Sequence, residues 1–385
     1  MDLTPLTFRA RVEEYEKQAG DLLNAWQAGD PGAIQIVRQK HPRFLNPEIP
    51  WLPRKMSEAE VRSVTLDRAD AELAVARWYD FDSWSRLAEY VEAVTRNDSP
   101  VSHFEAAVEA VIDGDVAALT SLLREHPDLV HARSTRVTPF DPPRHRATLL
   151  HYVGANGVES YRQKTPSTAV DVAKRLLEGG AEADALADMY GGHHTTMSML
   201  VSSSHPAEAG LQVALIHTLV DFGAAVDGHG SGEWTSPLMT ALAFGFLPAA
   251  EALVLRGARA DNIAAAAGLG RLEDARQWLG HASSADRHRA LALAAQHGHV
   301  EVVSLLLDAG EDPDRYNPKG NHAHTTPLHQ AVWSGHERVV RLLVERGARL
   351  DIKDTIYEAT PLGWATYGGR DGIAEYLRAR AIDAP

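Results

Sequence analysis

The 385-residue sequence contains no cysteine. Disulfide bonds, thiolate metal ligands and cysteine nucleophiles are therefore excluded, and a reducing compartment would not harm the chain. No apolar run approaches the ~20 residues that are needed to cross a bilayer. Residues 1–20 are polar and charged, without the apolar core or the cleavage site of a secretory signal. We therefore expect a cytoplasmic protein that does not bind a membrane.

Basic residues are also scarce, because 38 lysines and arginines face 52 aspartates and glutamates, for a formal charge of −14. A protein that binds nucleic acid needs a basic face to neutralise phosphates, so we expect no nucleic acid among the partners. The sequence also lacks a nucleophile elbow, a phosphate-binding loop and an HExxH motif. These absences favour a binding protein over an enzyme.

What the sequence does contain is a repeated pattern near its C-terminus. Thr-Pro-Leu-His-Gln-Ala begins at Thr326 and Thr-Pro-Leu-Gly-Trp-Ala begins at Thr360, which places Leu328 and Leu362 34 positions apart. Between them, residues 339–346 carry apolar side chains at helical spacing and stop at a glycine, which can adopt the left-handed turn that ends a helix. The same ending, a glycine followed by an aspartate, recurs at 180–184, 223–227, 257–261 and 310–314.

Each part of this pattern has a physical role. Threonine caps the first helix, and proline fits its first turn because no amide donor is needed there. Leucines fill the seam between helices, and the small alanine lets two helices approach closely. The pattern resembles that of the ankyrin-repeat family, whose unit of about 33 residues is a β-turn followed by two helices, and in particular a bacterial group with a helical N-terminal region. The resemblance implies an all-α solenoid of about eight stacked helix pairs with finger loops.

The expected repeats fill most of the chain after residue 98. Their approximate bounds are 104–138, 147–184, 194–227, 235–261, 262–284, 287–314, 325–351 and 359–382. The second and third carry insertions, at 158–167 and 202–210. The fifth is short and lacks the motif, so we expect the coupling between neighbouring repeats to be weakest there.

Residues 1–98 form a separate region in this interpretation. The sequence around Trp26 is echoed around Val111, and both are followed by an apolar helix that ends in His-Pro, at His41 and His126. We expect degenerate helix pairs here, because the terminal unit of a solenoid must present a polar outer face. The predicted domains are therefore an N-terminal helical cap over 1–98 and an ankyrin-repeat array over 99–385.

The finger loops and first helices carry the candidate binding residues. A solenoid presents a long concave surface made of these parts, and here they are rich in aromatic and histidine side chains. The candidates are Tyr190, His193, His194, Trp234, Tyr316, His322, His324, Trp333 and Tyr357. We therefore predict that the chain binds a protein partner through this surface, with a small molecule as a second class of ligand.

We predict no cofactor and no metal site. The residues that come nearest to a metal site are His322 and His324, because positions i and i+2 of an extended segment point to the same side and both imidazoles could meet one ion. We prefer the interpretation that both are polar histidines of a finger loop, which bond to the backbone or face a partner. His151 and His329 occupy the histidine position of the repeat motif, where a structural bond to the finger backbone is expected.

An enzyme or small-ligand receptor is the alternative hypothesis. Its site would lie where the enlarged fingers converge and would be lined by histidine and carboxylate groups. Residues 162–164 (Arg-Gln-Lys) could bind an anion, and His145, Glu159 or His194 could supply a general base. The histidines in the turns between helices are expected to be solvated. These are His297, His299 and His336.

Overall fold

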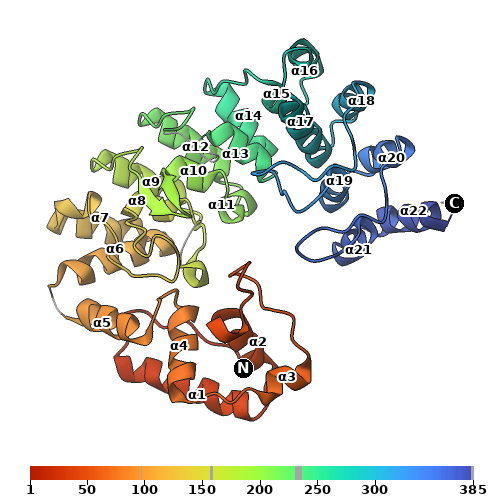
Figure 1. Ribbon diagram of the computed structural model, residues 1–385. Coiled ribbons are helices and arrows are strands. Elements are labelled where there is room, and N and C mark those ends of the chain that lie inside the picture. The colour runs from red at the N-terminus through yellow and green to blue at the C-terminus, as the bar shows by residue number, and fades with distance from the viewer. Residues whose placement is uncertain (97, 157–158, 230–235, 383–385) are drawn as a thin grey trace. The chain divides into compact units, whose positions relative to one another are not determined.

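The computed structural model describes residues 1–96, 98–156, 159–229 and 236–382. Almost all of the regular structure in these ranges is helical, as Figure 1 shows, and the strands they contain form one two-stranded sheet. The all-α solenoid that the sequence predicts is thus confirmed. The chain divides into two compact units, Met1–Gly223 and Ala224–Pro385, here called unit 1 and unit 2. The predicted boundary at residue 98 stays a prediction.

Unit 1 begins with a bundle of short helices around an aromatic core. The helices are α1 (Val12–Gln27), α2 (Pro31–Lys40), α3 (Glu58–Ser63), α4 (Arg68–Trp78) and α5 (Trp84–Thr95), with the 3-10 turn η1 (Pro42–Phe44) after α2. Asp30 and Asp67 accept backbone N–H bonds at the starts of α2 and α4, which fixes where these helices begin. The rings of Phe8, Tyr15 and Tyr79 are buried together between the helices.

The rest of unit 1 is built from helix pairs. They are α6 (Pro100–Asp113) with α7 (Val116–Glu125), α8 (Leu149–Val153) with α9 (Ala169–Glu178), and α10 (Thr196–Leu200) with α12 (Gln212–Asp221). First helices pack on first helices, and second helices on second helices. Smaller elements fill the loops: η2 (Pro127–Val130), η3 (Ser160–Arg162), α11 (Ser204–Glu208), and an antiparallel hairpin of β1 (Ala187–Met189) and β2 (Gly192–His194).

Unit 2 continues the pattern more regularly. Its pairs are α13 (Pro237–Ala243) with α14 (Leu247–Leu255), α15 (Ile263–Gly268) with α16 (Leu272–Leu279), α17 (Ser284–His297) with α18 (Val300–Asp308), α19 (Pro327–Ser334) with α20 (Glu337–Glu345), and α21 (Pro361–Tyr367) with α22 (Asp371–Ile382). The turn inside a pair uses glycine in the left-handed conformation, such as Gly298 at φ 82° and Gly335 at φ 80°.

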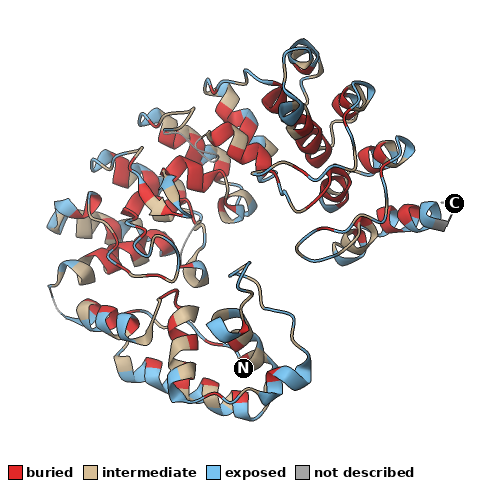
Figure 2. Ribbon diagram, viewed as in Figure 1, coloured by how far each residue is buried: buried red, intermediate tan, exposed pale blue. Residues whose placement is uncertain are grey.

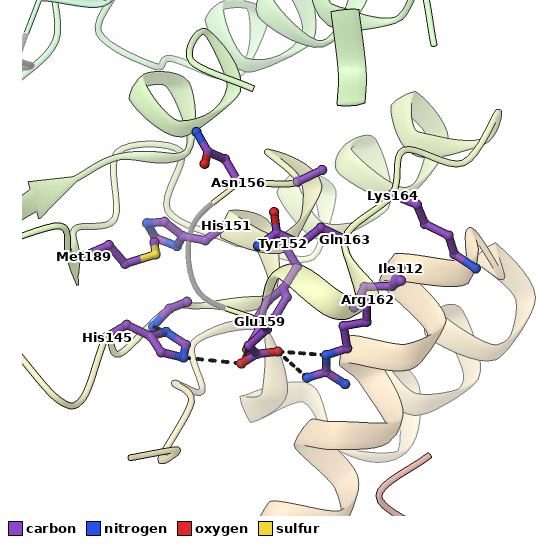
Figure 3. Close-up of a pocket in the computed structure, with 12 residues that line it drawn as sticks. Ile112, His145, His151, Tyr152, Asn156, Glu159, Arg162, Gln163, Lys164 and Met189 are labelled. Atoms are coloured by element: carbon purple, nitrogen blue, oxygen red, sulfur yellow. Dashed lines mark hydrogen bonds and ion pairs between the residues drawn. The ribbon is translucent and has the colours of Figure 1, made fainter. Parts of the chain in front are cut away.

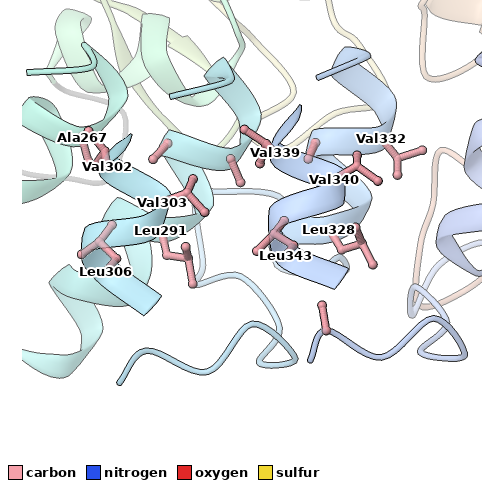
Figure 4. Packing of buried hydrophobic residues seen from close by; sticks show 14 of the residues in the cluster. Ala267, Leu291, Val302, Val303, Leu306, Leu328, Val332, Val339, Val340 and Leu343 are labelled. Atoms are coloured by element: carbon pink, nitrogen blue, oxygen red, sulfur yellow. The ribbon is translucent and has the colours of Figure 1, made fainter. Parts of the chain in front are cut away.

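One continuous apolar core runs through unit 2 from α15 to α22. Figure 4 shows Leu291, Val303 and Leu306 of one helix pair beside Leu328 and Val340 of the next. Burial of each such side chain contributes about 1.5–3 kcal/mol. Because each pair buries its apolar face on its neighbours, the stack supplies rigid first helices on which fingers and exposed side chains can be placed.

The fifth expected repeat forms a complete helix pair although it lacks the sequence motif. All six residues of α15, Ile263–Gly268, are buried, as the red ribbon in this part of Figure 2 shows. Four consecutive alanines have no bulk to hold the helices apart, so α15 packs closely on α17. Its partner α16 is different, because Ala275 is the only buried residue that its range contains.

Candidate functional site

Unit 2 contains a large hollow, here called the unit 2 groove, with a volume of about 1040 Å³. Its walls come from the turn after α13, the C-terminal ends of α17, α19 and α21, and two finger loops. The lining side chains of most interest are aromatic, imidazole and guanidinium groups. They are Phe244, Leu247, Gln296, His297, His322, His324, Gln330, Trp333, His336, Tyr357, Trp364, Tyr367 and Arg370.

An aromatic cluster forms one side of this groove. The rings of Trp333 and Trp364 meet edge to face with centroids 5.7 Å apart, and Trp333 stacks on Tyr367 at 6.5 Å. Tyr357 and His324 add further ring contacts with Trp364, at 6.5 and 6.0 Å. Edge-to-face and offset contacts of this kind stabilise aromatic pairs beyond their buried area. The cluster is therefore ordered before any ligand arrives.

A buried carboxylate fixes the finger that carries Tyr357. Asp354 accepts the backbone N–H groups of Ile356, Tyr357 and Ala359 at 2.6–3.0 Å, and the indole N–H of Trp364 at 2.9 Å. Burial alone would raise the pKa of Asp354, but these donors hold it below the ordinary value. The finger and the aromatic cluster are thus locked to each other through one ionised side chain.

The histidines in the turns between helices are not solvated, so that expectation was wrong. His297 donates from Nε2 to the carbonyl of Leu242 at 2.8 Å, and His299 donates to the carbonyl of Gly268 at 3.0 Å. Each imidazole thus lies against a carbonyl at the C-terminal end of an earlier first helix, where carbonyls lack the donor of a following helical turn. Burial lowers the pKa of His297 to about 4 and also lowers that of His299 and His336.

The two motif histidines have the structural role that the sequence predicts. His329 accepts from the backbone N–H of Thr326 at 3.4 Å and donates from Nε2 to the carbonyl of Ala359 at 3.2 Å. His151 makes the equivalent bonds to Thr148 and to the carbonyl of His194, at 3.2 and 3.1 Å. Each imidazole therefore ties a helix start to the next finger.

The geometry assumed for a metal ion at His322 and His324 does not occur. His322 has φ 57°, so the segment is not extended, although the rings of His322 and His324 lie 6.2 Å apart. The Nε2 of His322 donates to the carbonyl of Ala243 at 2.9 Å, so this nitrogen is already engaged. Within the described ranges, there is no group of three histidine, cysteine, aspartate or glutamate side chains placed to hold a metal ion.

The structure brings four of the nine predicted binding residues into the unit 2 groove: His322, His324, Trp333 and Tyr357. Tyr316 lies apart from its lining and joins two fingers, because its hydroxyl donates to the carbonyl of Lys353 at 2.7 Å. Tyr190, His193 and His194 lie in or beside the β1–β2 hairpin of unit 1. Trp234 lies outside the described residues.

Some groove residues escaped the sequence prediction. Phe244, Tyr367 and Arg370 all line the groove. A signal for Tyr367 was present in the repeat register, because it follows Leu362 by five positions just as Trp333 follows Leu328. Equivalent positions of successive repeats lie side by side in a solenoid. For Phe244 and Arg370 the sequence offers no comparable signal.

The alternative site in unit 1 is assembled but closed. Figure 3 shows His145, Glu159 and Arg162 converging on one small cavity, which Gln163 and Lys164 also line. Its volume is about 20 Å³, which leaves space for about one water molecule. His194, the third candidate base, is not part of its lining.

Every group in this unit 1 cluster already has a partner. Glu159 accepts from Arg136 at 2.8 Å, from Arg162 at 2.8 Å, from His145 at 3.3 Å and from Tyr152 at 2.9 Å. Burial would raise the pKa of Glu159, but Arg136, Arg162 and His145 hold it well below the ordinary value. A carboxylate so stabilised is a poor base, and Arg162, which also pairs with Glu105, is not available to an anion. The predicted anion site is therefore not formed.

Stacked helix pairs with finger loops and a lined groove define the chain as a helical repeat protein. The sequence model for ankyrin repeats (three copies) matches residues 262–354. Cyclin-dependent kinase 4 inhibitor B of Bos taurus is 32% identical over 122 residues, which cover 24% of this chain and 92% of that protein. The chain belongs to the ankyrin-repeat family.

Two further proteins are also similar to this chain. The putative E3 ubiquitin-protein ligase XBAT31 of Arabidopsis thaliana is 34% identical over 100 residues, which cover 26% of this chain and only 21% of the plant protein. The ankyrin repeat domain of human ASB11 aligns with a TM-score of 0.37 at 20% identity, over 71% of this chain and 96% of that domain. In the described part of the chain, no helix has the length and apolar character to cross a membrane.

Proposed function

We propose that the chain is a binding module that holds a segment of a protein partner in the unit 2 groove. Ankyrin repeats are in general protein–protein interaction modules. The observation that carries the proposal is the exposure of the aromatic cluster: Trp333 is 47% exposed, Tyr357 59% and Tyr367 87%. Rings that combine apolar area with a hydrogen-bonding tip gain most from being covered, and such residues dominate the binding energy of interfaces.

The placement of these rings supports a macromolecular ligand. Trp333 and Tyr367 come from the C-terminal ends of two neighbouring first helices, and Tyr357 comes from a finger. A ligand that covers all three must extend over two repeats. The rings rest on helices whose other faces are buried in the core, so little order has to be created on binding.

The alternative function, catalysis or small-ligand binding by paired histidine and carboxylate groups, has less support. The part of the unit 2 groove lining that the structure describes contains histidines but neither aspartate nor glutamate. The unit 1 cluster contains both kinds of group but has space for about one water molecule. Neither described region therefore has both histidine and carboxylate side chains beside a cavity that could hold a ligand.

The test uses random decapeptides displayed on phage and selected against the full chain. Selected peptides are then measured against two variants, Trp333→Ala and Trp278→Ala. We expect Trp333→Ala to weaken binding by about 1–2 kcal/mol or more, the range for an interface anchor. Trp278 is the matched control, because it is 38% exposed and lies on the second helix α16, away from the groove.

Selected peptides that bind Trp333→Ala as tightly as the unchanged chain would overturn the proposal, as would a selection that enriches no peptide. The absence of cysteine allows a second, direct readout. Tyr367→Cys and Arg338→Cys each create a single attachment point for a photocrosslinker, in the groove and on α20 respectively. Crosslinking to the peptide from position 338 but not from position 367 would also contradict the proposal.

A further inference from the structure

The charges of unit 2 are unevenly distributed over its helices, and α17, α20 and α22 carry charges of both signs. The first helices α13, α15, α19 and α21 contain no charged residue. The second helices α14, α16 and α18 carry mostly carboxylates, which are Glu251, Glu273, Asp274, Glu301 and Asp308. The whole chain has a formal charge of −14. In these repeats Glu337, Glu358 and Asp371 adjoin lining residues in the sequence, but none of the three belongs to the described lining.

The groove itself has the opposite polarity. Among the described residues that line the groove, Arg370 is the one permanently charged side chain, and no carboxylate accompanies it. The loop that contributes His322 and His324, residues 309–326, carries Glu311, Asp312 and Asp314 in its first part and Arg315 and Lys319 in the part that leads to these histidines. Arg289 donates to the carbonyl of Lys319 at 3.0 Å, which brings a third cation to this finger. Asp354, beside the groove, is fully engaged by the donors described above.

Arg370 lies directly beside the aromatic cluster. Its Nε and Nη2 donate to the carbonyl of Trp333 at 3.2 and 2.9 Å, and the side chain is exposed. These two bonds hold the guanidinium next to the ring that is proposed as the anchor. A ligand that covers Trp333 therefore places its neighbouring residues within reach of one fixed positive charge.

The extent of the lining suggests the length of the ligand. The groove runs past the ends of α17, α19 and α21, which are successive first helices. Packed helices lie about 8–10 Å apart, so two intervals span roughly 20 Å. An extended chain covers about 3.3–3.6 Å per residue, so roughly six residues fill this distance.

We propose that the occupant of the groove is an extended acidic peptide segment of about six residues, which packs one aromatic or large aliphatic side chain on Trp333 and Tyr367 and pairs an adjacent carboxylate with Arg370. This inference rests on the proposed function, because it assumes that the groove binds a protein segment. What it adds is the chemistry of that segment, argued from the charge complementarity of the groove.

The experiment reads the composition of the decapeptides selected by three forms of the full chain: unchanged, Arg370→Glu and Arg338→Glu. We expect the unchanged chain and Arg338→Glu, whose charge lies on α20 away from the groove, to enrich aspartate and glutamate next to an aromatic residue. Arg370→Glu should select lysine or arginine in those places. Neutral or basic peptides from the unchanged chain, or the same peptides from Arg370→Glu, would overturn the inference.

Conservative variants separate charge from structure. Arg370→Gln should lower the affinity for a selected acidic peptide by about threefold at low salt, as expected for one partly exposed ion pair, and the difference should disappear in 1 M salt. Arg370→Lys keeps the charge but not the paired bonds to Trp333, and should recover most of the affinity. Equal losses in the Gln and Lys variants would mean that Arg370 acts only by positioning Trp333, against the inference.

The outcomes also distinguish this inference from the proposed function. Neutral peptides whose binding is lost in Trp333→Ala would leave the proposed function intact and refute the acidic ligand. Acidic peptides that bind Trp333→Ala unchanged would refute the groove as their site, and with it both proposals. A ten-residue oligo-dT strand serves as a further probe of polyanion binding. Its displacement of a selected peptide at equal concentration would point to nucleic acid and also overturn the inference.

Discussion

Arg136 in unit 1 and Trp333 in unit 2 each contact several aromatic rings, but Arg136 is fully buried whereas Trp333 is half exposed. The guanidinium of Arg136 lies 4.3 Å from the ring centroid of Phe81 and 4.9 Å from that of Phe8, and it bonds to Glu159. In unit 1 the rings therefore enclose an ion pair. In unit 2 the aromatic rings border an open groove, where their exposed faces can contact a ligand.

The difference between the two units shows that side chains of a catalytic type form a ligand site only where they border a cavity large enough for a ligand. His145, Glu159 and Arg162 are the kinds of residue that a catalytic site needs, yet they satisfy one another around a cavity of about 20 Å³. Trp333 and Tyr367 carry no catalytic chemistry, yet they border a hollow of about 1040 Å³. Four experiments test this difference between the two units.

The largest effect is expected from Glu159→Gln in unit 1. The variant keeps the size of the side chain but leaves two buried guanidinium groups without their shared carboxylate. Breaking a buried ion pair in this way costs about 3–5 kcal/mol. Urea denaturation should show this decrease in the free energy of unfolding, and hydrogen exchange of α6 and α8 should locate it in unit 1.

The matched control is Lys164→Gln, which removes the exposed partner of Asp113. An exposed pair contributes about 0–1 kcal/mol, so this variant should be nearly as stable as the unchanged chain. Equal stability of Glu159→Gln and Lys164→Gln would mean that the cluster is not the closed structural element described here.

Acidification should affect unit 2 before it affects the Glu159 cluster. Burial lowers the pKa of His297 to about 4, below the ordinary 6.5. Between these two pKa values the unfolded chain binds a proton at His297 and the folded chain does not. The contribution of His297 to the free energy of unfolding is therefore fully present above pH 6.5 and is lost as the pH falls from 6.5 toward 4. At pH 5 the loss from His297 alone is about 2 kcal/mol. Burial also lowers the pKa of other histidines of unit 2: His288, His299, His322, His324, His329 and His336.

Glu159 responds in a lower pH range. Its folded-state pKa lies below the ordinary 4.5, so its contribution is complete above pH 4.5 and is lost only as the pH falls further. Fewer histidines of unit 1 have a lowered pKa, namely His41, His151 and His194. Hydrogen exchange at pH 7.5 and pH 5 should therefore show that amides of unit 2 lose more protection on acidification than amides of unit 1. His297→Gln should reduce the loss of protection in unit 2. A larger loss in unit 1 would contradict the assignment.

These contrasts mark what the sequence can and cannot predict. The repeats were readable because their signals are local: Thr326 caps its helix through His329, and Gly335 turns the chain within a few residues. The groove was only half predicted because its contacts join distant segments. His322 bonds to Ala243, 79 positions away, and His297 bonds to Leu242, 55 positions away.

The unit 1 cluster illustrates the same limit for chemistry. The local pattern at 159–164 indicated that polar groups gather there, and they do. What saturates Glu159 and Arg162 comes from Arg136 and Glu105, which the sequence places well before them. Whether a charged group is available therefore depends on partners from other elements, and no local pattern reports them.

The third prediction compares two aromatic residues of unit 2. Trp333→Ala should weaken a selected peptide by about 1–2 kcal/mol, whereas Tyr316→Phe should leave its affinity nearly unchanged. Loss of the bond from Tyr316 to the carbonyl of Lys353 should instead destabilise the two fingers by about 0.5–1.5 kcal/mol. Titration by fluorescence anisotropy and hydrogen exchange of residues 315–325 and 351–359 measure the two effects. A loss of affinity in Tyr316→Phe without faster exchange would extend the binding surface beyond the groove.

The smallest effect concerns how firmly the groove is supported by the fifth repeat. Within α16 only Ala275 is buried, whereas α20 buries Val339, Val340 and Leu343. Local opening is easiest where few apolar contacts must be broken, so amides of α16 should exchange faster than those of α20. The first helix α15 is fully buried and should stay as protected as α17. Mass spectrometry of peptides from 263–268, 272–279 and 339–345 tests this directly. Equal protection of α16 and α20 would refute the expected weak point, and fast exchange in α15 would mean that the first helices are less rigid than the groove requires.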